Sequence, residues 1–402
     1  MQNNISEPME PSEQFCPNLA CCARGQKGQG NIIIHDRQRQ RYRCKSCQQT
    51  FSARRGTMLE GLRKPTELIV IVVTLLAYGC PVQAVVKAFG LDERTVASWR
   101  DRAGAQCHRV QEAVVQSGTL SLTHVQADEI RVKTRAGIMW MGLALLVESR
   151  LWIAGVVQHS RDRSLADRLL HQVRACAQSV SQILVCVDGW GAYPKAIVRA
   201  FREKVQTTGG KGRCCLQVWP HLLIGQVIKK QHKHRTVEVK RTLLRGEESA
   251  ALACLHDSGG SKASNTSFIE RFNATMRERL AALTRRCRHA SQRLEAVQWG
   301  MYLIGCTYNL CWVHQQLGRT PAMAAGLSDH AWSVKEVLCY KVAPAPFEPS
   351  KRPRGRPRTR PRVDEPTVKA PRGGPSRYLS ILRRLQEERR ATLPQGATSP
   401  TG

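Results

Sequence analysis

The spacing of apolar residues predicts a helical region in the first third of the chain. Residues 66–78, 81–89 and 92–105 repeat apolar positions every three to four residues, which indicates three helices. Pro81 stands at the start of the second helix, and Gly90 stands in the turn that follows it. We therefore expect a compact unit of three helices joined by tight turns.

A second spacing, typical of strands, begins after this unit. Residues 124–132, 138–147 and 151–157 are rich in β-forming residues and are separated by short turns, as in a three-stranded meander. The all-apolar run 183–187 is typical of a buried central strand. The sequence therefore predicts an α/β domain after the helical one.

A later segment, after the loop 258–261, again has the helical repeat. Its apolar stripe consists of Ile269, Phe272, Met276, Leu280 and Leu283. Glu270, Asn273 and Arg277 share a neighbouring face. A carboxylate with a cation two turns away suits a metal-dependent phosphoryl-transfer site that also contacts a DNA backbone. A capping box formed by Ser267 and Glu270 is the alternative.

Two aspartates favour the interpretation as a metal site. Asp188 follows the apolar run 183–187, and polar ligands gather at such strand ends. Asp128 lies inside a predicted strand, where acids are depleted. Asp188 before Gly189 is also a common turn residue, and Asp128 could face solvent on an edge strand. Three clustered carboxylates would repel one another, so they would need a cation such as Mg²⁺ or Mn²⁺.

These acids and their neighbours resemble a known signature. Asp128, Asp188 with Gly189 and Trp190, and Glu270 followed by Arg277 resemble the Asp, Asp, Glu (DDE) signature of bacterial insertion-sequence transposases. The most similar type is the IS-one-like kind, which carries an N-terminal zinc finger and a helix-turn-helix. Further likeness to the end of such catalytic domains lies in Tyr308, Asn309, Leu310, His314 and residues 317–322.

The resemblance covers about residues 16–335 and implies a ribonuclease-H-like α/β catalytic domain over residues 118–335. It implies metal-dependent strand cleavage at element ends and strand transfer into target DNA, with double-stranded DNA as partner and a homo-oligomer in the synaptic complex. The implied catalytic and metal-binding acids are Asp128, Asp188 and Glu270. The residues placed to hold the element end are Arg271, Asn273 and Arg277. In a departure from several insertion-sequence groups, Ala263 and Thr266 replace the usual Tyr and Arg.

Charge points to the same kind of partner. The chain has 62 Lys and Arg against 31 Asp and Glu, a net charge of +31 and a pI near 10.2. Such an excess favours binding to a polyanion. The apolar run 68–77 is too short to cross a bilayer, and residues 1–14 do not resemble a signal sequence. We expect a cytoplasmic protein whose 16 cysteines are free or metal-bound.

Four cysteines have metal-ligand spacing. Cys16, Cys21, Cys44 and Cys47 can close a tetrahedral structural Zn²⁺ site in a zinc-ribbon-like module over residues 1–60. Cys22 could replace Cys21 in this set. An unmetallated loop with incidental thiols is the alternative.

The three predicted helices have the punctuation of a helix-turn-helix, over residues 66–117. The last helix would lie in the DNA major groove and expose Arg94, Ser98 and Arg102. An ordinary three-helix packing unit is the alternative.

Basic residues also gather in two other places. Lys229 and Lys230 begin a basic stretch before the Glu270 helix that could follow a DNA backbone. Residues 343–402 are dense in Pro, Arg and Lys at first, so we expect a disordered tail. Within it, Arg354, Gly355, Arg356 and Pro357 resemble an AT-hook, a motif for the minor groove of A·T-rich DNA. A nonspecific basic tail is the alternative.

Together these features predict a multidomain DNA transposase. One rival is a catalytically inactive former transposase that acts through its zinc and helix-turn-helix modules. Another is a related integrase or nuclease, with the same core and a different substrate.

Overall fold

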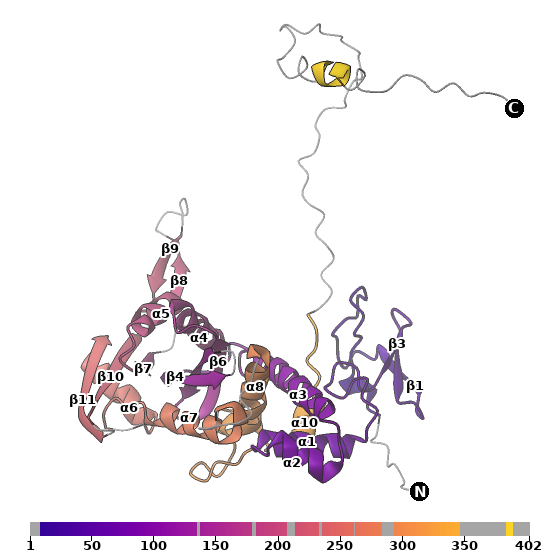
Figure 1. Ribbon diagram of the computed structural model, residues 1–402, viewed down its shortest axis with the longest axis horizontal. Helices are drawn as coiled ribbons and strands as arrows, with labels where there is room; N and C mark the ends of the chain where they lie inside the picture. The colour runs from indigo at the N-terminus through magenta and orange to yellow at the C-terminus, as the bar shows by residue number, and fades with distance from the viewer. Residues whose placement is uncertain are drawn as a thin grey trace, which may run out of the picture. The chain divides into compact units, whose positions relative to one another are not determined.

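The computed structural model describes residues 9–134, 137–178, 182–206, 214–232, 235–260, 262–283, 293–345 and 383–388 (Figure 1). The chain separates into two units, Met1–Phe347 and Glu348–Gly402. In the second unit, residues 383–388 are helical. The AT-hook-like residues Arg354, Gly355, Arg356 and Pro357 lie outside the described residues.

The N-terminal module is built on a small antiparallel sheet with a core of its own. After the short 3₁₀ helix η1 (Pro11–Glu13), strands β1 (Ile32–Asp36), β2 (Arg41–Cys44) and β3 (Thr50–Ser52) pair in the order β1-β2-β3. The rings of Tyr42 and Phe51 pack 5.9 Å apart, in a cluster separate from the main core. So small a core leaves room for a metal to contribute to stability.

Three helices follow, as predicted. They are α1 (Thr66–Ala77), α2 (Val82–Phe89) and α3 (Glu93–Val114). Gly90 ends α2 in the left-handed conformation, and the Asp92 carboxylate caps α3 by accepting from the main-chain N–H groups of Arg94 and Thr95 at 2.9 and 3.2 Å.

Helix α3 extends beyond the predicted end at residue 105. Gly104 lies inside the helix. Atoms of Trp299 come within 2.3–2.6 Å of the position that a Cβ of residue 104 would occupy, so a larger residue would clash there. The glycine instead allows α8 (Leu294–Leu310) to approach α3 closely. Packing against α8 buries Cys107 and Val110 and so supports the extra turns.

A six-stranded mixed sheet forms the centre of the α/β part. Its order is β11-β10-β7-β4-β5-β6, with β7 parallel to both β4 and β10 and the other pairs antiparallel. The strands are β4 (His124–Thr134), β5 (Gly137–Leu146), β6 (Leu151–Gln158), β7 (Ile183–Val187), β10 (Leu222–His232) and β11 (Arg235–Arg245). The predicted meander and the predicted central strand are both confirmed.

Helices cover both faces of this sheet (Figure 1). Helices α4 (Arg163–Cys176) and α5 (Ala192–Ala200) pack on one face, and α6 (Glu248–Asp257) and α7 (Ser267–Arg279) pack on the other. The remaining elements are the hairpin β8 (Arg202–Val205) and β9 (Cys215–Val218), the 3₁₀ helix η2 (Ala281–Leu283), and α9 (Pro321–Ala324) and α10 (Val334–Cys339). All five residues of the predicted apolar stripe are buried, as expected. The helix is shorter than predicted, because α7 ends at Arg279, and Leu280 and Leu283 lie in its C-cap and in η2.

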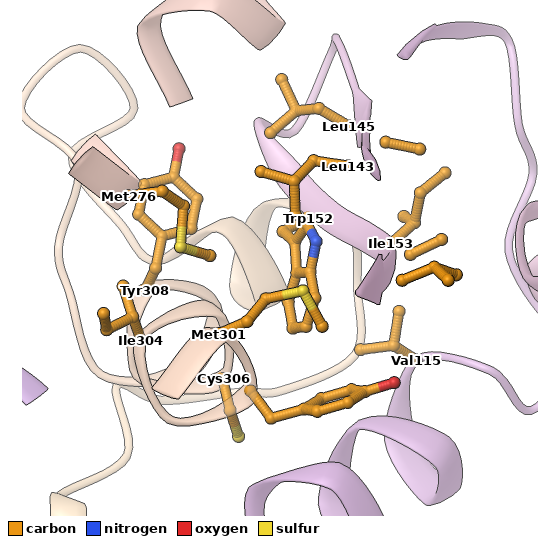
Figure 2. Packing of buried hydrophobic residues seen from close by; sticks show 14 of the residues in the cluster. Val115, Leu143, Leu145, Trp152, Ile153, Met276, Met301, Ile304, Cys306 and Tyr308 are labelled. Atoms are coloured by element: carbon orange, nitrogen blue, oxygen red, sulfur yellow. The ribbon is translucent and has the colours of Figure 1, made fainter. Parts of the chain in front are cut away.

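Trp152 of β6 is the centre of the packing between sheet and helices (Figure 2). Its ring lies 5.6 Å from that of Tyr302 and 6.4 Å from that of Phe272. Gly305 of α8 admits this ring, since a Cβ at residue 305 would lie 2.2 Å from it. Asn309 completes the contact by accepting from Trp152 N at 2.9 Å and donating to Trp152 O at 2.8 Å. These contacts attach α8 to β6, the edge strand of the sheet.

Within the described part of the chain, no helix has both the length and the apolar character needed to span a bilayer.

Candidate metal and nucleic-acid site

The four predicted cysteines of the N-terminal module meet. Their sulfur atoms all lie within 4.8 Å of one another, with Cys16 Sγ 3.6 Å from Cys47 Sγ and Cys21 Sγ 3.9 Å from Cys44 Sγ. A Zn–S bond of about 2.3 Å gives a tetrahedron with edges of about 3.8 Å, and a disulfide would need about 2.05 Å. The cluster could therefore bind zinc. Cys21 belongs to this cluster, whereas Cys22 is exposed and lies outside it, so Cys22 does not replace Cys21.

A cavity of about 490 Å³ lies where β4, β7, β10 and α7 meet. It is lined by Asp128, Asp188, Gly189, Val227, Ile228, Lys229, Thr266, Glu270, Asn273 and Arg277. The three predicted acids therefore line one cavity. The predicted shared face of α7 is present too, since Glu270, Asn273 and Arg277 all reach this cavity.

The pairing of β4 with β7 brings the two aspartates together. Ala127 pairs with Val187 in the parallel ladder, so Asp128 and Asp188 are the next residues on each strand. Strand β4 lies between β7 and β5, so the alternative that Asp128 faces solvent on an edge strand is wrong. Asp188 Oδ1 accepts from Trp190 N at 3.0 Å. Asp188 is therefore a turn residue as well as a lining residue of the cavity.

Helix α7 is fixed to β4 by side-chain contacts at its N-terminus. Gln126 Oε1 accepts from the main-chain N–H groups of Phe268 and Ile269, both at 3.0 Å. Gln126 Nε2 donates to Asn265 Oδ1 at 3.2 Å, and Asn265 Oδ1 also accepts from the Ser267 hydroxyl at 2.7 Å. Because Gln126 and Asn265 occupy the helix start, the capping-box alternative for Ser267 is wrong.

The Glu270 carboxylate is consequently available to the cavity. It accepts from the Thr266 hydroxyl at 2.6 Å and forms an ion pair with Lys229 of β10. One turn further along α7, Asn273 Nδ2 donates to Asp128 Oδ2 at 2.8 Å. Helix α7 thus supplies both an acid and an orienting amide to the same site.

The cavity stabilises the protonated form of Asp128. Burial, followed by the charges of Glu129, Asp188 and Glu270, raises the pKa of Asp128 to about 7. A divalent cation would reverse this effect, because it favours the ionised carboxylate. The donor set therefore fits a hard cation such as Mg²⁺ or Mn²⁺.

One acid of this site was missed in the sequence. Carboxylate oxygens of Asp128, Glu129 and Asp188 lie within 4.8 Å of one another, and this group could bind a divalent metal. The Glu129 side chain is only 3% exposed; it pairs with Arg161 and accepts from the Tyr193 hydroxyl at 2.8 Å. The available signal was a second consecutive acid inside a strand.

The predicted DNA-contacting residues divide into several groups. Lys229 and Arg277 line the cavity, whereas Lys230 pairs with Glu238 of β11 at 2.8 Å. Arg271 is exposed and does not line the cavity. Arg94 and Ser98 are exposed on α3, as expected.

Arg102 differs from expectation. It is partly buried, and its guanidinium donates to the main-chain oxygens of Met58, at 3.2 Å, and Glu60. The prediction that Arg102 is an exposed group is therefore wrong. These carbonyls precede α1 and were not identifiable as partners from the spacing within α3.

Neither a family model nor a curated protein sequence matches this chain. The functional argument therefore rests on the residues and their geometry.

Proposed function

We propose that the chain is a DNA transposase of the DDE type, which cleaves DNA strands and joins them to a target by divalent-metal-dependent phosphoryl transfer. The observation that carries this proposal is the single cavity lined by Asp128, Asp188 and Glu270 together with Arg277. Carboxylates suit hard cations, and a cationic side chain in the same cavity suits a phosphodiester.

The arrangement of elements supports a ribonuclease-H-like core. Asp128 and Asp188 come from two neighbouring parallel strands, and Glu270 comes from a helix that packs on β4 and β5. The resemblance of the sequence implies the same source for each acid. Exposed Arg94 and Ser98 on α3 and the net charge of +31 support DNA as the partner.

Each residue of the cavity would have a separate role. A bound divalent cation supplies Lewis acidity and helps to ionise the attacking oxygen. Asp128 and Asp188 would hold it, with Glu129 or Glu270 as the third ligand. Asn273 orients Asp128 through its hydrogen bond, and Arg277 would bind a phosphate oxygen.

The test compares two glutamates that pair with consecutive lysines of β10. Glu270 pairs with Lys229 at the cavity, and Glu238 pairs with Lys230 outside it. The substrate is a plasmid that carries the coding sequence with its flanking DNA, in Mg²⁺ or Mn²⁺. We expect Glu270→Gln to lower strand cleavage by orders of magnitude, because it removes a negative charge from a site that must hold cations. Glu238→Gln should cleave like the wild type.

Metal binding gives a second readout. Calorimetric titration with Mn²⁺ should show weaker binding to Glu270→Gln and unchanged binding to Glu238→Gln. Cleavage that survives in Glu270→Gln would contradict the assignment of Glu270 and favour Glu129 as the third acid. The exposed Glu278, a further candidate on α7, does not line the cavity. A wild-type protein that binds DNA without metal-dependent cleavage would favour the inactive, DNA-binding alternative.

A further inference from the structure

A group of basic side chains lies beside α7 and outside the cavity. It consists of Arg271 of α7, Arg150 in the turn between β5 and β6, and His314 after α8. Burial lowers the pKa of Arg150, Tyr308 opposes this effect, and the charge of Arg271 adds to it. Burial, followed by the charges of Arg150 and Arg271, lowers the pKa of His314. Arg150 is placed at α7 by its contact with the ring of Phe268, which lies three residues before Arg271. No described acid forms an ion pair with any of them.

Arg150 is held in one position before any ligand arrives. Its guanidinium lies over the Phe268 ring, 3.7 Å from the ring centroid, and donates to the main-chain oxygen of Val147. Arg150 itself adopts a positive φ of 60°. A guanidinium held by a ring contact and a hydrogen bond has already lost part of the side-chain entropy that binding would cost.

His314 has an unused ring nitrogen. Its Nδ1 is shielded from solvent and has no hydrogen-bond partner among the described residues. The main chain of His314 is fixed, because its N–H donates to Arg319 O at 3.0 Å. An unpaired, shielded polar atom is costly. A phosphate oxygen that reached Nδ1 on binding would remove that cost by accepting from the neutral ring with its proton on Nδ1, or from the protonated ring below its lowered pKa.

The spacing along α7 places this group next to the cavity. Phe268 and Arg271 are three residues apart and therefore lie on one side of the helix, and Arg150 stacks on that side. Glu270, the residue before Arg271, faces the cavity. A strand bound at the cavity could therefore pass over the first turns of α7 to the basic group.

We propose that Arg150, Arg271 and His314 form a second site for a DNA phosphodiester, on the strand that enters the carboxylate cavity. This inference rests on the proposed function. Two guanidinium groups and an imidazole offer the charge and the donors that a phosphate oxygen prefers. The site would fix the strand at one point while Arg277 binds it at another.

The test measures DNA binding without metal, so that it does not depend on catalysis. Fluorescence anisotropy of a labelled 40-base-pair duplex in EDTA is followed as the salt concentration rises. Loss of one phosphate contact in Arg150→Gln should reduce the slope of log K against log salt by about 0.9, and affinity near 0.1 M salt should fall roughly five- to tenfold. His314→Gln should weaken binding below its pKa and have less effect above it.

Arg174 provides a matched control. It also stacks on an aromatic ring, 4.3 Å from the centroid of Trp219, but it pairs with Glu203 at 3.3 Å. Arg174→Gln should leave the salt slope unchanged. If Arg150→Gln does not fold, the exposed Arg271→Gln carries the same prediction, and Arg150→Lys should restore part of the slope because it keeps the charge.

An unchanged slope in Arg150→Gln and Arg271→Gln, with wild-type binding intact, would overturn the site and leave the proposed function standing. Cleavage absent from the wild type, with the slope change present, would overturn the proposed function alone. A further arm compares thermal stability in sodium phosphate and in sodium chloride at equal ionic strength. Stabilisation by phosphate that requires Arg150, without any change in the DNA slope, would assign the site to a small anion and overturn the DNA contact.

Discussion

Asp128 should make the metal-free protein less stable as the pH rises, and Asp128→Asn should remove that effect. Asn has the same size as Asp, and its amide can still form a hydrogen bond with Asn273. The pKa of Asp128 is about 7 in the folded protein, against an ordinary 3.8. The folded state therefore binds this proton more tightly than the unfolded chain does. Its contribution to stability is complete below about pH 4 and is lost as the pH rises through 7.

The size of the effect follows from the width of this window. Between the two pKa values, the stabilisation from Asp128 falls by about 1.4 kcal/mol for each pH unit. From about pH 5.5 to the pKa of about 7 this is about 1.5 pH units, and above the pKa the curve flattens, so little more is lost by about pH 8. The wild type should lose about 2 kcal/mol over this interval through Asp128 alone. The stability of Asp128→Asn relative to wild type should therefore rise by the same amount, which is roughly 4–8 °C in Tm.

The assay is thermal unfolding in EDTA, followed by tryptophan fluorescence at both pH values. The exposed Asp257→Asn provides the control and should track the wild type. Adding Mg²⁺ at about pH 8 should stabilise the wild type more than Asp128→Asn, because a ligand that binds the native site stabilises the folded state by mass action. A difference between Asp128→Asn and wild type that does not change with pH would refute the reasoning, since burial and neighbouring acids would then not raise this pKa.

Three other predictions concern separate parts of the chain. Purified protein should contain about one zinc per chain by elemental analysis; Cys44→Ala should lose it and weaken DNA binding, and Cys22→Ala should keep it. Lys229→Met removes the counter-ion of Glu270 and should tighten Mn²⁺ binding in calorimetry and lower cleavage, whereas Lys230→Met should leave the Mn²⁺ affinity unchanged. Equal Mn²⁺ affinities in the wild type and both variants would exclude competition between Lys229 and the metal. Deletion of residues 344–402 should lower the salt dependence of DNA binding and leave metal-dependent cleavage measurable, and an unchanged salt slope would show that the tail does not contact DNA.

Local features of the sequence were sufficient to predict much of the framework. The run 183–187 is a strand with those bounds, and Asp188 follows it. Five β-forming apolar residues that end at an Asp-Gly turn favour a buried strand. Glu270, Asn273 and Arg277 all line the cavity, because residues three and seven positions apart lie on one face of a helix. Each of these predictions depends on neighbours within a few residues.

Contacts between distant residues were not predictable in this way. Glu129 belongs to the acidic group because Arg161 and Tyr193 hold it there, and Tyr193 is 64 positions away. The helix start at Ser267 looked like a capping box because the true cap, Gln126, is more than 140 positions away. Arg102 was wrongly expected to be exposed, since its carbonyl partners lie more than 40 positions before it. Periodicity within an element does not carry information of this kind.

Helix α7 explains why three functions can coexist within 13 residues. Its apolar side, which includes Ile269 and Met276, is buried and sets stability. Its second side brings Glu270 to the cavity, and its third side carries Arg271, a member of the basic group. Since adjacent residues of a helix are about 100° apart, neighbouring substitutions should have unrelated effects. Ile269→Ala should lower the free energy of unfolding by about 2–5 kcal/mol. Glu270→Gln should lower cleavage by orders of magnitude. Arg271→Gln should lower the affinity for DNA and its salt dependence.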